Sequence, residues 1–335
     1  MKNRKILIFA TLFLIIVSSL TVYYKATAYQ ETVFSEKEIK SKISAESMMS
    51  TIKYISKAPR RNGTGELKKV ASYLASELKK MKYSTQIQKF NYKLYVPEDL
   101  NPKVYFKPVS DKDKDGTSEN IVAIKSSKVK NAPILVISAH YDTYMDSVGA
   151  VDNASGVAVV TETARILKDV SLPFEIQFVL FSGEEVGGFG SKAYISSMNQ
   201  SVRKRVKGAL NIDSIGFKQK DGYTLMSCRA VSSNKNHLPQ EVDSDLILGD
   251  TSNMITNLFK NNKRLDLLPG VSSDHFAFSV AGIPSASILG KLNRELIQTI
   301  NTSNDTIDKI DKNRLVESTE FVVFAINKLK VSGFK

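Results

Sequence analysis

Cysteine and histidine are scarce in this chain of 335 residues. Cys228 is the only cysteine, so a disulfide bond within the chain and a metal site built from several thiolates are both excluded. The three histidines are His140, His237 and His275, and any metal site must therefore take most of its ligands from carboxylates. No Gly-x-Ser-x-Gly sequence is present, which argues against a serine hydrolase with a nucleophile elbow.

Acidic residues are outnumbered by basic ones. The chain has 34 Asp and Glu against 47 Lys and Arg, which gives a formal net charge of +13 at pH 7. The basic residues are scattered in short groups, such as 79–80, 203–205 and 263–264, and are not gathered with aromatic side chains. We interpret them as a solvated surface that favours anionic membranes or cell-wall polymers, and we expect no nucleic acid as a partner.

The first 28 residues have the composition of an export segment. The cations Lys2, Arg4 and Lys5 precede an apolar run at 6–24, and such an arrangement directs export. Residues 26–28 read Ala-Thr-Ala, which fits a cleavage site, whereas a run of about 19 apolar residues is also long enough to span a bilayer. We therefore expect 1–28 to be either a signal peptide or a membrane anchor. In both cases the rest of the chain is extracytoplasmic, either secreted or anchored in the cell membrane.

The remaining chain alternates between strand-like and helix-like patterns. Residues 29–46 are polar and charged, and we expect a linker there, followed by one domain at 47–335. The run 132–142 is largely apolar, as in a strand buried on both faces. The alternation predicts an α/β domain of three layers, in which a mainly parallel mixed sheet is covered by helices on both faces. Other predicted elements include a helix at 252–262.

Polar residues gather where the predicted strands stop. His140 and Asp142 close one strand, and Asp152 follows in the next loop. Glu184 and Glu185 close the next strand, and Asp213 closes the one after it. Because ligands bind at the carboxyl ends of strands in open α/β sheets, we expect these side chains to share one edge. Several carboxylates in one place repel one another unless a cation lies between them, and ligation by an imidazole and carboxylates suits zinc.

Five sequence motifs, in this order and spacing, resemble those of the co-catalytic zinc aminopeptidases. These are the enzymes of the bacterial leucyl aminopeptidase type, which are related to glutaminyl cyclases. The motifs are "SAHYDT", "GAVDNASG", "FSGEEVGGFGS", "NIDSIG" and "SSDHFAF…GIP". The resemblance runs from about residue 47 to 332 and implies a zinc exopeptidase-like fold and peptide substrates.

The resemblance also implies a role for each residue at the strand ends. His140 and Asp213 correspond to ligands of one zinc ion, Asp152 to the carboxylate that bridges two metals, and Glu185 to a ligand of the second metal. Glu184 corresponds to the general base, which takes a proton from water and returns it to the leaving amine. Asp142 corresponds to the carboxylate that holds the imidazole ring of His140, since the second ring nitrogen of a metal-bound histidine needs an acceptor.

One position departs from the family pattern. The family has a histidine ligand before a "T-x-x-D-T" stretch, and here the matching stretch, "TINTSNDTIDKID", has Asn301 at that position. An amide oxygen is a poorer zinc ligand than an imidazole. Three outcomes stay open: the second metal is bound weakly while the first zinc suffices, Asn301 or another residue replaces the ligand, or activity is reduced. We expect one zinc ion to bind and the second position to be weakened.

Taken together, these features predict an exported zinc-dependent aminopeptidase. It would hydrolyse N-terminal residues from peptides with metal-activated water and Glu184 as the base. Two alternatives stay open: a single-zinc enzyme like the glutaminyl cyclases, and a catalytically impaired binding protein that retains the fold. The chain has no tryptophan to line a pocket as in the cyclases. His275 is either a structural histidine near the site or a substrate contact, and His237 is expected to be solvated.

Overall fold

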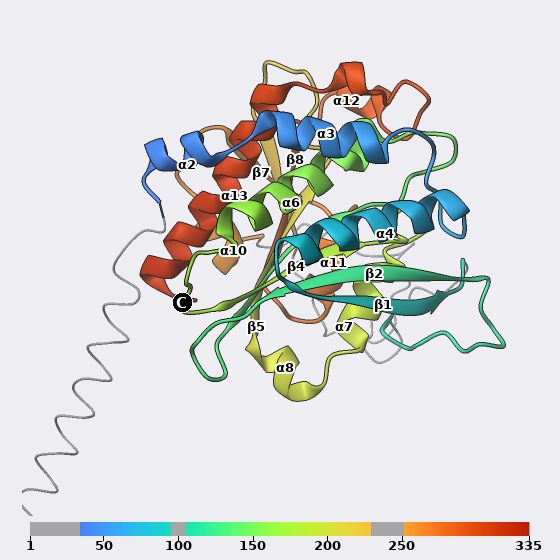
Figure 1. Cartoon of the computed structure of the whole chain (residues 1–335), viewed down its shortest axis with the longest axis horizontal. Helices are drawn as coiled ribbons and strands as arrows, with labels where there is room; N and C mark the ends of the chain where they lie inside the picture. The colour runs from blue at the N-terminus through green and yellow to red at the C-terminus, as the bar shows by residue number, and fades with distance from the viewer. Residues whose placement is uncertain (1–33, 95–104, 229–250, 335) are drawn as a thin grey trace, which may run out of the picture.

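A computed structural model describes residues 34–94, 105–228 and 251–334 (Figure 1). Within these residues, eight strands form one mixed sheet in the order β1-β2-β4-β3-β5-β8-β6-β7. The strands are β1 (Ser84–Tyr92), β2 (Gly116–Lys125), β3 (Ile134–His140), β4 (Glu175–Phe181), β5 (Val206–Asp213), β6 (Tyr223–Ser227), β7 (Leu265–Pro269) and β8 (Ser285–Gly290). The α/β fold with a mixed sheet confirms the fold predicted from the sequence.

The centre of the sheet is parallel. Strand β3 pairs in parallel with β4 and β5, and β5 pairs in parallel with β8. Strand β2 is antiparallel to both β1 and β4, whereas β6 is antiparallel to β8 and parallel to β7. All seven residues of β3 are buried, as expected for a parallel strand with helices on both faces. The carboxyl ends of β3, β4 and β5 therefore meet at one edge.

Helices cover both faces of the sheet (Figure 1). The larger core joins one face to α3 (Ala45–Ile55), α4 (Gly65–Lys80), α6 (Gly156–Leu167) and α13 (Lys312–Ser332). A smaller core joins the other face to α7 (Phe189–Ser196) and α11 (His275–Val280). Residues of β3 alternate between the two cores, with Leu135 and Ile137 in the first and Ile134 and Val136 in the second, because side chains alternate along a strand.

The segment predicted as a linker, 29–46, differs from that prediction in its described part. Ser35 caps a helix, α2 (Glu36–Lys42), through a reciprocal pair of hydrogen bonds with Glu38. The helix buries Ile39, and the Asn327 side chain of α13 donates to the carbonyl oxygen of Phe34 at 2.8 Å. The sequence prediction failed because a short polar helix owes its stability to a distant partner. The export segment 1–28 lies outside the described residues.

Two elements near the C-terminal side also differ from the sequence prediction. The helix predicted at 252–262 is limited to one short turn, α10 (Met254–Asn257), and the unpredicted edge strand β7 follows it. Strand β7 exposes Leu267 and Leu268 and therefore lacks the buried alternation that marks a strand in sequence. The remaining short helices are α8 (Gln200–Arg205) and α12 (Arg294–Thr299). Among the described residues, no helix is long and apolar enough to cross a bilayer.

Candidate metal centre

Three side chains that are distant in sequence converge at the carboxyl edge of the sheet. His140 is the last residue of β3, and its Nε2 lies 3.0 Å from Asp152 Oδ1 and 3.4 Å from Asp213 Oδ1. Asp213 is the last residue of β5, and all three residues are buried. Ligand atoms about 2.1 Å from a tetrahedral zinc ion lie about 3.4 Å apart. The spacing and the donor set of one imidazole and two carboxylates therefore fit a single zinc ion.

The turn that carries Asp152 is held from two directions. A segment of π-helix, η1 (Ala150–Ser155), follows β3, and the Asp152–Asn153 peptide bond is cis. Asp305 accepts hydrogen bonds from the backbone N–H groups of Val151 at 2.6 Å and Asp152 at 2.9 Å. Asn153 donates to the carbonyl oxygen of Ile212 in β5 at 2.9 Å. These contacts fix the turn relative to the strand that supplies Asp213.

Arg60 brings a positive charge to the carboxylate cluster. Its side chain is fully buried and donates to four backbone carbonyl oxygens, those of Tyr141 at 2.6 Å, Val148 at 2.5 Å, Gly149 at 2.8 Å and Ile55 at 3.4 Å. Burial lowers the pKa of Arg60 to about 10, so the guanidinium stays charged at neutral pH. Arg60 therefore braces the loop between His140 and Asp152 and offsets part of the negative charge there.

Asp142 lies between the imidazole of His140 and the loop that carries Glu184 and Glu185, here called the glutamate loop. Its oxygens accept from the backbone N–H groups of Glu184 and Glu185, each at 3.3 Å, and from the Asn62 side chain at 3.2 Å. Asp142 Oδ1 lies 3.6 Å from His140 Nδ1, which is beyond hydrogen-bond distance. His140 Nδ1 is buried and has no hydrogen-bond partner among the described residues. Asp142 thus faces the imidazole as expected, but its hydrogen bonds hold the glutamate loop.

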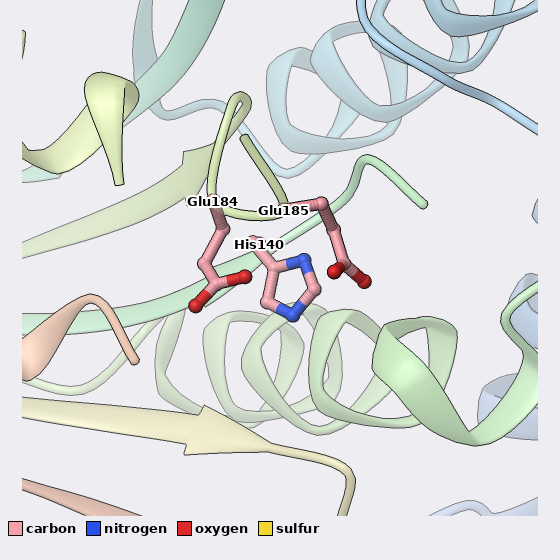
Figure 2. A group of neighbouring side chains, drawn as sticks. All are labelled: His140, Glu184 and Glu185. Carbon is pink, nitrogen blue, oxygen red and sulfur yellow. The ribbon is translucent and has the colours of Figure 1, made fainter. Parts of the chain in front are cut away.

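Glu184 and Glu185 follow β4 and flank the His140 ring on opposite sides in Figure 2. The two carboxylates and a ring nitrogen of His140 form a second group whose ligand atoms all lie within 4.8 Å of one another. Both glutamates are partly exposed, unlike the buried His140. The cluster therefore opens to solvent on the side of the glutamates.

The charges of the cluster favour a bound cation. Burial and the neighbouring Asp152 raise the pKa of Glu185 to about 9, and burial raises the pKa of Glu184 well above its usual range. Although burial opposes a charged ring, Asp213 and Glu184 raise the pKa of His140 well above its usual value. Without a cation the cluster therefore takes up protons, and a divalent ion replaces them.

Asn301 lies where the sequence comparison placed it, against Glu185. One terminal atom of its amide is 2.9 Å and 3.3 Å from the two oxygens of Glu185. With Nδ2 in that position, Asn301 donates hydrogen bonds to Glu185, whereas an oxygen there would face two acceptors. The backbone of Asn301 is left-handed, with a φ of 60°. The Asn301 amide therefore contacts both oxygens of the Glu185 carboxylate.

The two remaining histidines are His275 and His237. His275 is fully buried, and its two ring nitrogens are hydrogen-bonded to Ser287 and to the carbonyl oxygen of Gly270. His275 is thus satisfied inside the core. His237 lies outside the described residues.

Sequence reasoning missed four residues that contribute to this site. Arg60 and Asn62 belong to the "APRRNG" stretch, in which no local pattern marks them as neighbours of the cluster. Asp305 is the aspartate of the "T-x-x-D-T" stretch, but that pattern alone does not show that its carboxylate holds the Asp152 turn. Asp274 is buried, neither of its oxygens has a hydrogen-bond partner in the part of the chain that the structure describes, and burial raises its pKa to about 7. His140 and Asp213 influence that pKa, which places Asp274 beside the cluster.

The family model described as Peptidase family M28 matches residues 120–326, which include every residue of the cluster except Arg60 and Asn62. The chain belongs to peptidase family M28. Aminopeptidase YwaD of Bacillus subtilis strain 168 is 33% identical over 214 residues, which are 63% of this chain and 44% of that protein. The chain thus spans about half the length of the curated relatives that it matches.

Solved structures share the fold of this M28 chain. BSAP, a zinc aminopeptidase from Bacillus subtilis, superposes with a TM-score of 0.68 at 23% identity and covers 85% of this chain and 94% of its own. The glutaminyl cyclase of Porphyromonas gingivalis superposes with a TM-score of 0.62 at 20% identity and covers 86% and 99%. An aminopeptidase and a cyclase are therefore both built on this fold, and the choice between them depends on the site.

Proposed function

We propose that this M28 chain is a zinc-dependent aminopeptidase that removes N-terminal residues from peptides. The observation that carries the proposal is the convergence of His140, Asp152 and Asp213 beside Glu184. His140, Asp152 and Asp213 would hold one zinc ion. Glu184 is the carboxylate that is free for proton transfer, because it accepts no hydrogen bond at its side chain in the described part of the chain.

The reaction assigned to the site divides between the metal and the protein. Bound zinc supplies Lewis acidity, which makes water acidic enough to yield hydroxide near neutral pH. Glu184 accepts the proton from water and later donates it to the amine that leaves when the peptide bond breaks. Asp142 keeps the backbone of Glu184 in place through its hydrogen bond to that N–H group. The raised pKa of Glu184 suits a group that must both take up and release a proton.

We propose that one zinc ion suffices and that the second position is weak. Asp152 and Glu185 are left as its carboxylate ligands, and the Asn301 amide competes for Glu185 as a hydrogen-bond donor. An imidazole is the better zinc ligand. The Asn301→His variant is therefore expected to bind close to two zinc ions where the natural chain binds close to one, as measured by metal analysis after dialysis. Unchanged stoichiometry would show that Asn301 is not at the missing ligand.

The cyclase alternative is favoured by the fold of the Porphyromonas gingivalis structure. A cyclase releases ammonia from an N-terminal glutamine, whereas an aminopeptidase releases a free amino acid. We expect amino-acid p-nitroanilides to be hydrolysed and a glutaminyl peptide to lose its first residue without ring formation. Mass spectrometry of the glutaminyl peptide decides, since a mass loss of ammonia with no shortened product would reverse the assignment.

A binding protein without catalysis would retain the fold but has no need of a base beside a zinc site. Zinc well below half an equivalent in a folded sample would support that alternative.

We also propose that the chain is exported, on the basis of the cations at 2–5 and the apolar run at 6–24. It would then act on peptides outside the cytoplasm, either secreted or held at the membrane by that segment.

A further inference from the structure

A second layer of polar residues lies beneath the zinc ligands. Ser138 precedes His140 by two residues in β3, and Asn211 precedes Asp213 by two residues in β5. Ser287 of β8 is the register partner of Asn211. Side chains two residues apart in a strand share a face, so this layer lies under the ligands. All three side chains are fully buried, which makes the direction of each hydrogen bond important.

Asn211 is the centre of this layer. Its Nδ2 donates to Ser273 Oγ at 2.7 Å and to Ser287 Oγ at 2.9 Å, and its Oδ1 accepts from Ser138 at 2.9 Å. Ser273 Oγ in turn donates to Asp213 Oδ2 at 2.6 Å. The second oxygen of Asp213, Oδ1, is the one that faces His140. The chain of hydrogen bonds thus holds Oδ2 of Asp213, while Oδ1, which also accepts from Ser214 Oγ at 3.1 Å, lies at the zinc position.

His275, at the end of this chain of hydrogen bonds farthest from Asp213, fixes which group donates in each of them. His275 Nε2 lies 2.9 Å from the carbonyl oxygen of Gly270, which can only accept, so Nε2 carries the proton. Burial lowers the pKa of His275 to about 4, so the ring is neutral and Nδ1 is an acceptor. Ser287, 2.9 Å from Nδ1, therefore donates its hydroxyl proton to the ring and can only accept from Asn211.

Ser287 must accept a hydrogen bond, and Ser273 must accept one so that its own proton is directed to Asp213. The Asn211 amide group donates both of these hydrogen bonds. If the amide were reversed, Ser273 would donate to it, and Asp213 Oδ2 would lose the hydrogen bond that it accepts from Ser273. We propose that Asn211 is a positioning residue, whose amide is locked by Ser138, Ser287 and His275 and fixes, through Ser273, which oxygen of Asp213 is presented to zinc. The inference rests on the proposed function, since it takes Asp213 as a zinc ligand.

The test measures the dissociation constant of zinc in the purified chain by chelator competition, together with the Tm of the metal-free protein. Loss of a partner that orients a metal ligand lowers metal affinity by about 10- to 100-fold, and Asn211→Ala is expected to fall in that range. Ser287→Ala removes one hydrogen bond of the chain and is expected to weaken zinc binding about fivefold. This smaller change also provides a test if Asn211→Ala does not fold.

The matched control is Ser285→Ala, on the same strand as Ser287. Ser285 is also buried, and it donates to the carbonyl oxygen of His275 without joining the chain to Asp213. The two serine variants should lose similar Tm without metal, but only Ser287→Ala should bind zinc more weakly. Equal zinc affinity in the two serine variants, or natural affinity in a folded Asn211→Ala protein, would overturn the inference. Absence of zinc binding in the natural chain would instead refute the proposed function, and this inference with it.

Discussion

Glu184→Gln is expected to lower kcat for an amino-acid p-nitroanilide by about a thousandfold, since proton transfer by a positioned carboxylate contributes about 10²- to 10⁴-fold. The amide has nearly the shape of the carboxylate but cannot accept a proton. Zinc content should stay at the level of the natural chain, because in the proposed site His140, Asp152 and Asp213 would hold the zinc ion. Steady-state kinetics and metal analysis on the same sample check both parts.

The control for this variant is Glu175→Gln, at the start of the strand that ends next to Glu184. Glu175 pairs with Arg205 at 3.0 Å, far from the cluster along β4. The substitution should leave kcat within about twofold, because a single partly exposed ion pair contributes little. Full activity in Glu184→Gln would remove the base assignment, whereas equal losses in both variants would point to a general effect on folding.

Removal of zinc is expected to lower the Tm by about 6 °C at pH 8. A ligand present at about a thousand times its dissociation constant stabilises a protein by about 4 kcal/mol. With an unfolding entropy of about 2.1 cal/mol/K per residue, 1 kcal/mol corresponds to about 1.5 °C in a chain of 335 residues. The carboxylates add a dependence on pH. Glu185 has its pKa raised from 4.5 to about 9, and Asp274 from 3.8 to about 7.

The sign of that dependence follows from the raised pKa values. A carboxylate whose pKa is higher in the folded state stabilises the fold below its unfolded pKa, and this contribution is lost as pH rises through the folded pKa. His275 has the opposite sign, since its pKa is lowered to about 4, but its contribution changes only below about 6.5. The metal-free protein should therefore become less stable between pH 6.5 and 9.

Thermal unfolding with zinc and with chelator at pH 6.5, 8 and 9 measures this effect. The difference in Tm between the two forms should widen with pH, because zinc replaces the protons that the metal-free cluster requires. The effect of pH on surface charge is the same in the zinc-bound and metal-free forms, so it cancels in the difference between their Tm values. A difference that narrows from pH 6.5 to 9 would contradict the assignment of zinc to these carboxylates.

The residues that sequence analysis placed correctly are those with a local signal. The apolar run ending at His140 and the strand ending at Asp213 mark both the sheet and the edge where ligands meet. Asn301 could be placed because the stretch around it has a family pattern, and its contact with Glu185 agrees with that placement.

The residues that sequence analysis missed act over long separations. Asp305 holds the backbone at Val151 and Asp152, more than 150 residues away, and Arg60 holds carbonyl oxygens more than 80 residues away. The Arg60 contacts leave no periodic or local pattern, and the "T-x-x-D-T" stretch that contains Asp305 does not show which distant backbone its carboxylate holds. The helix α2 was missed for the same reason, since its partner is the last helix of the chain.

The pairing of α2 with α13 determines how the molecule can be tethered. Phe34 contacts Asn327 in the last turns of α13, and the Phe334 ring just beyond that helix meets Phe174 at the start of β4. Strand β4 has seven residues and is about 23 Å long, and Glu184 lies past its other end. A chain held at a membrane through the residues before Phe34 would therefore present its zinc edge outward, where passing peptides can reach it.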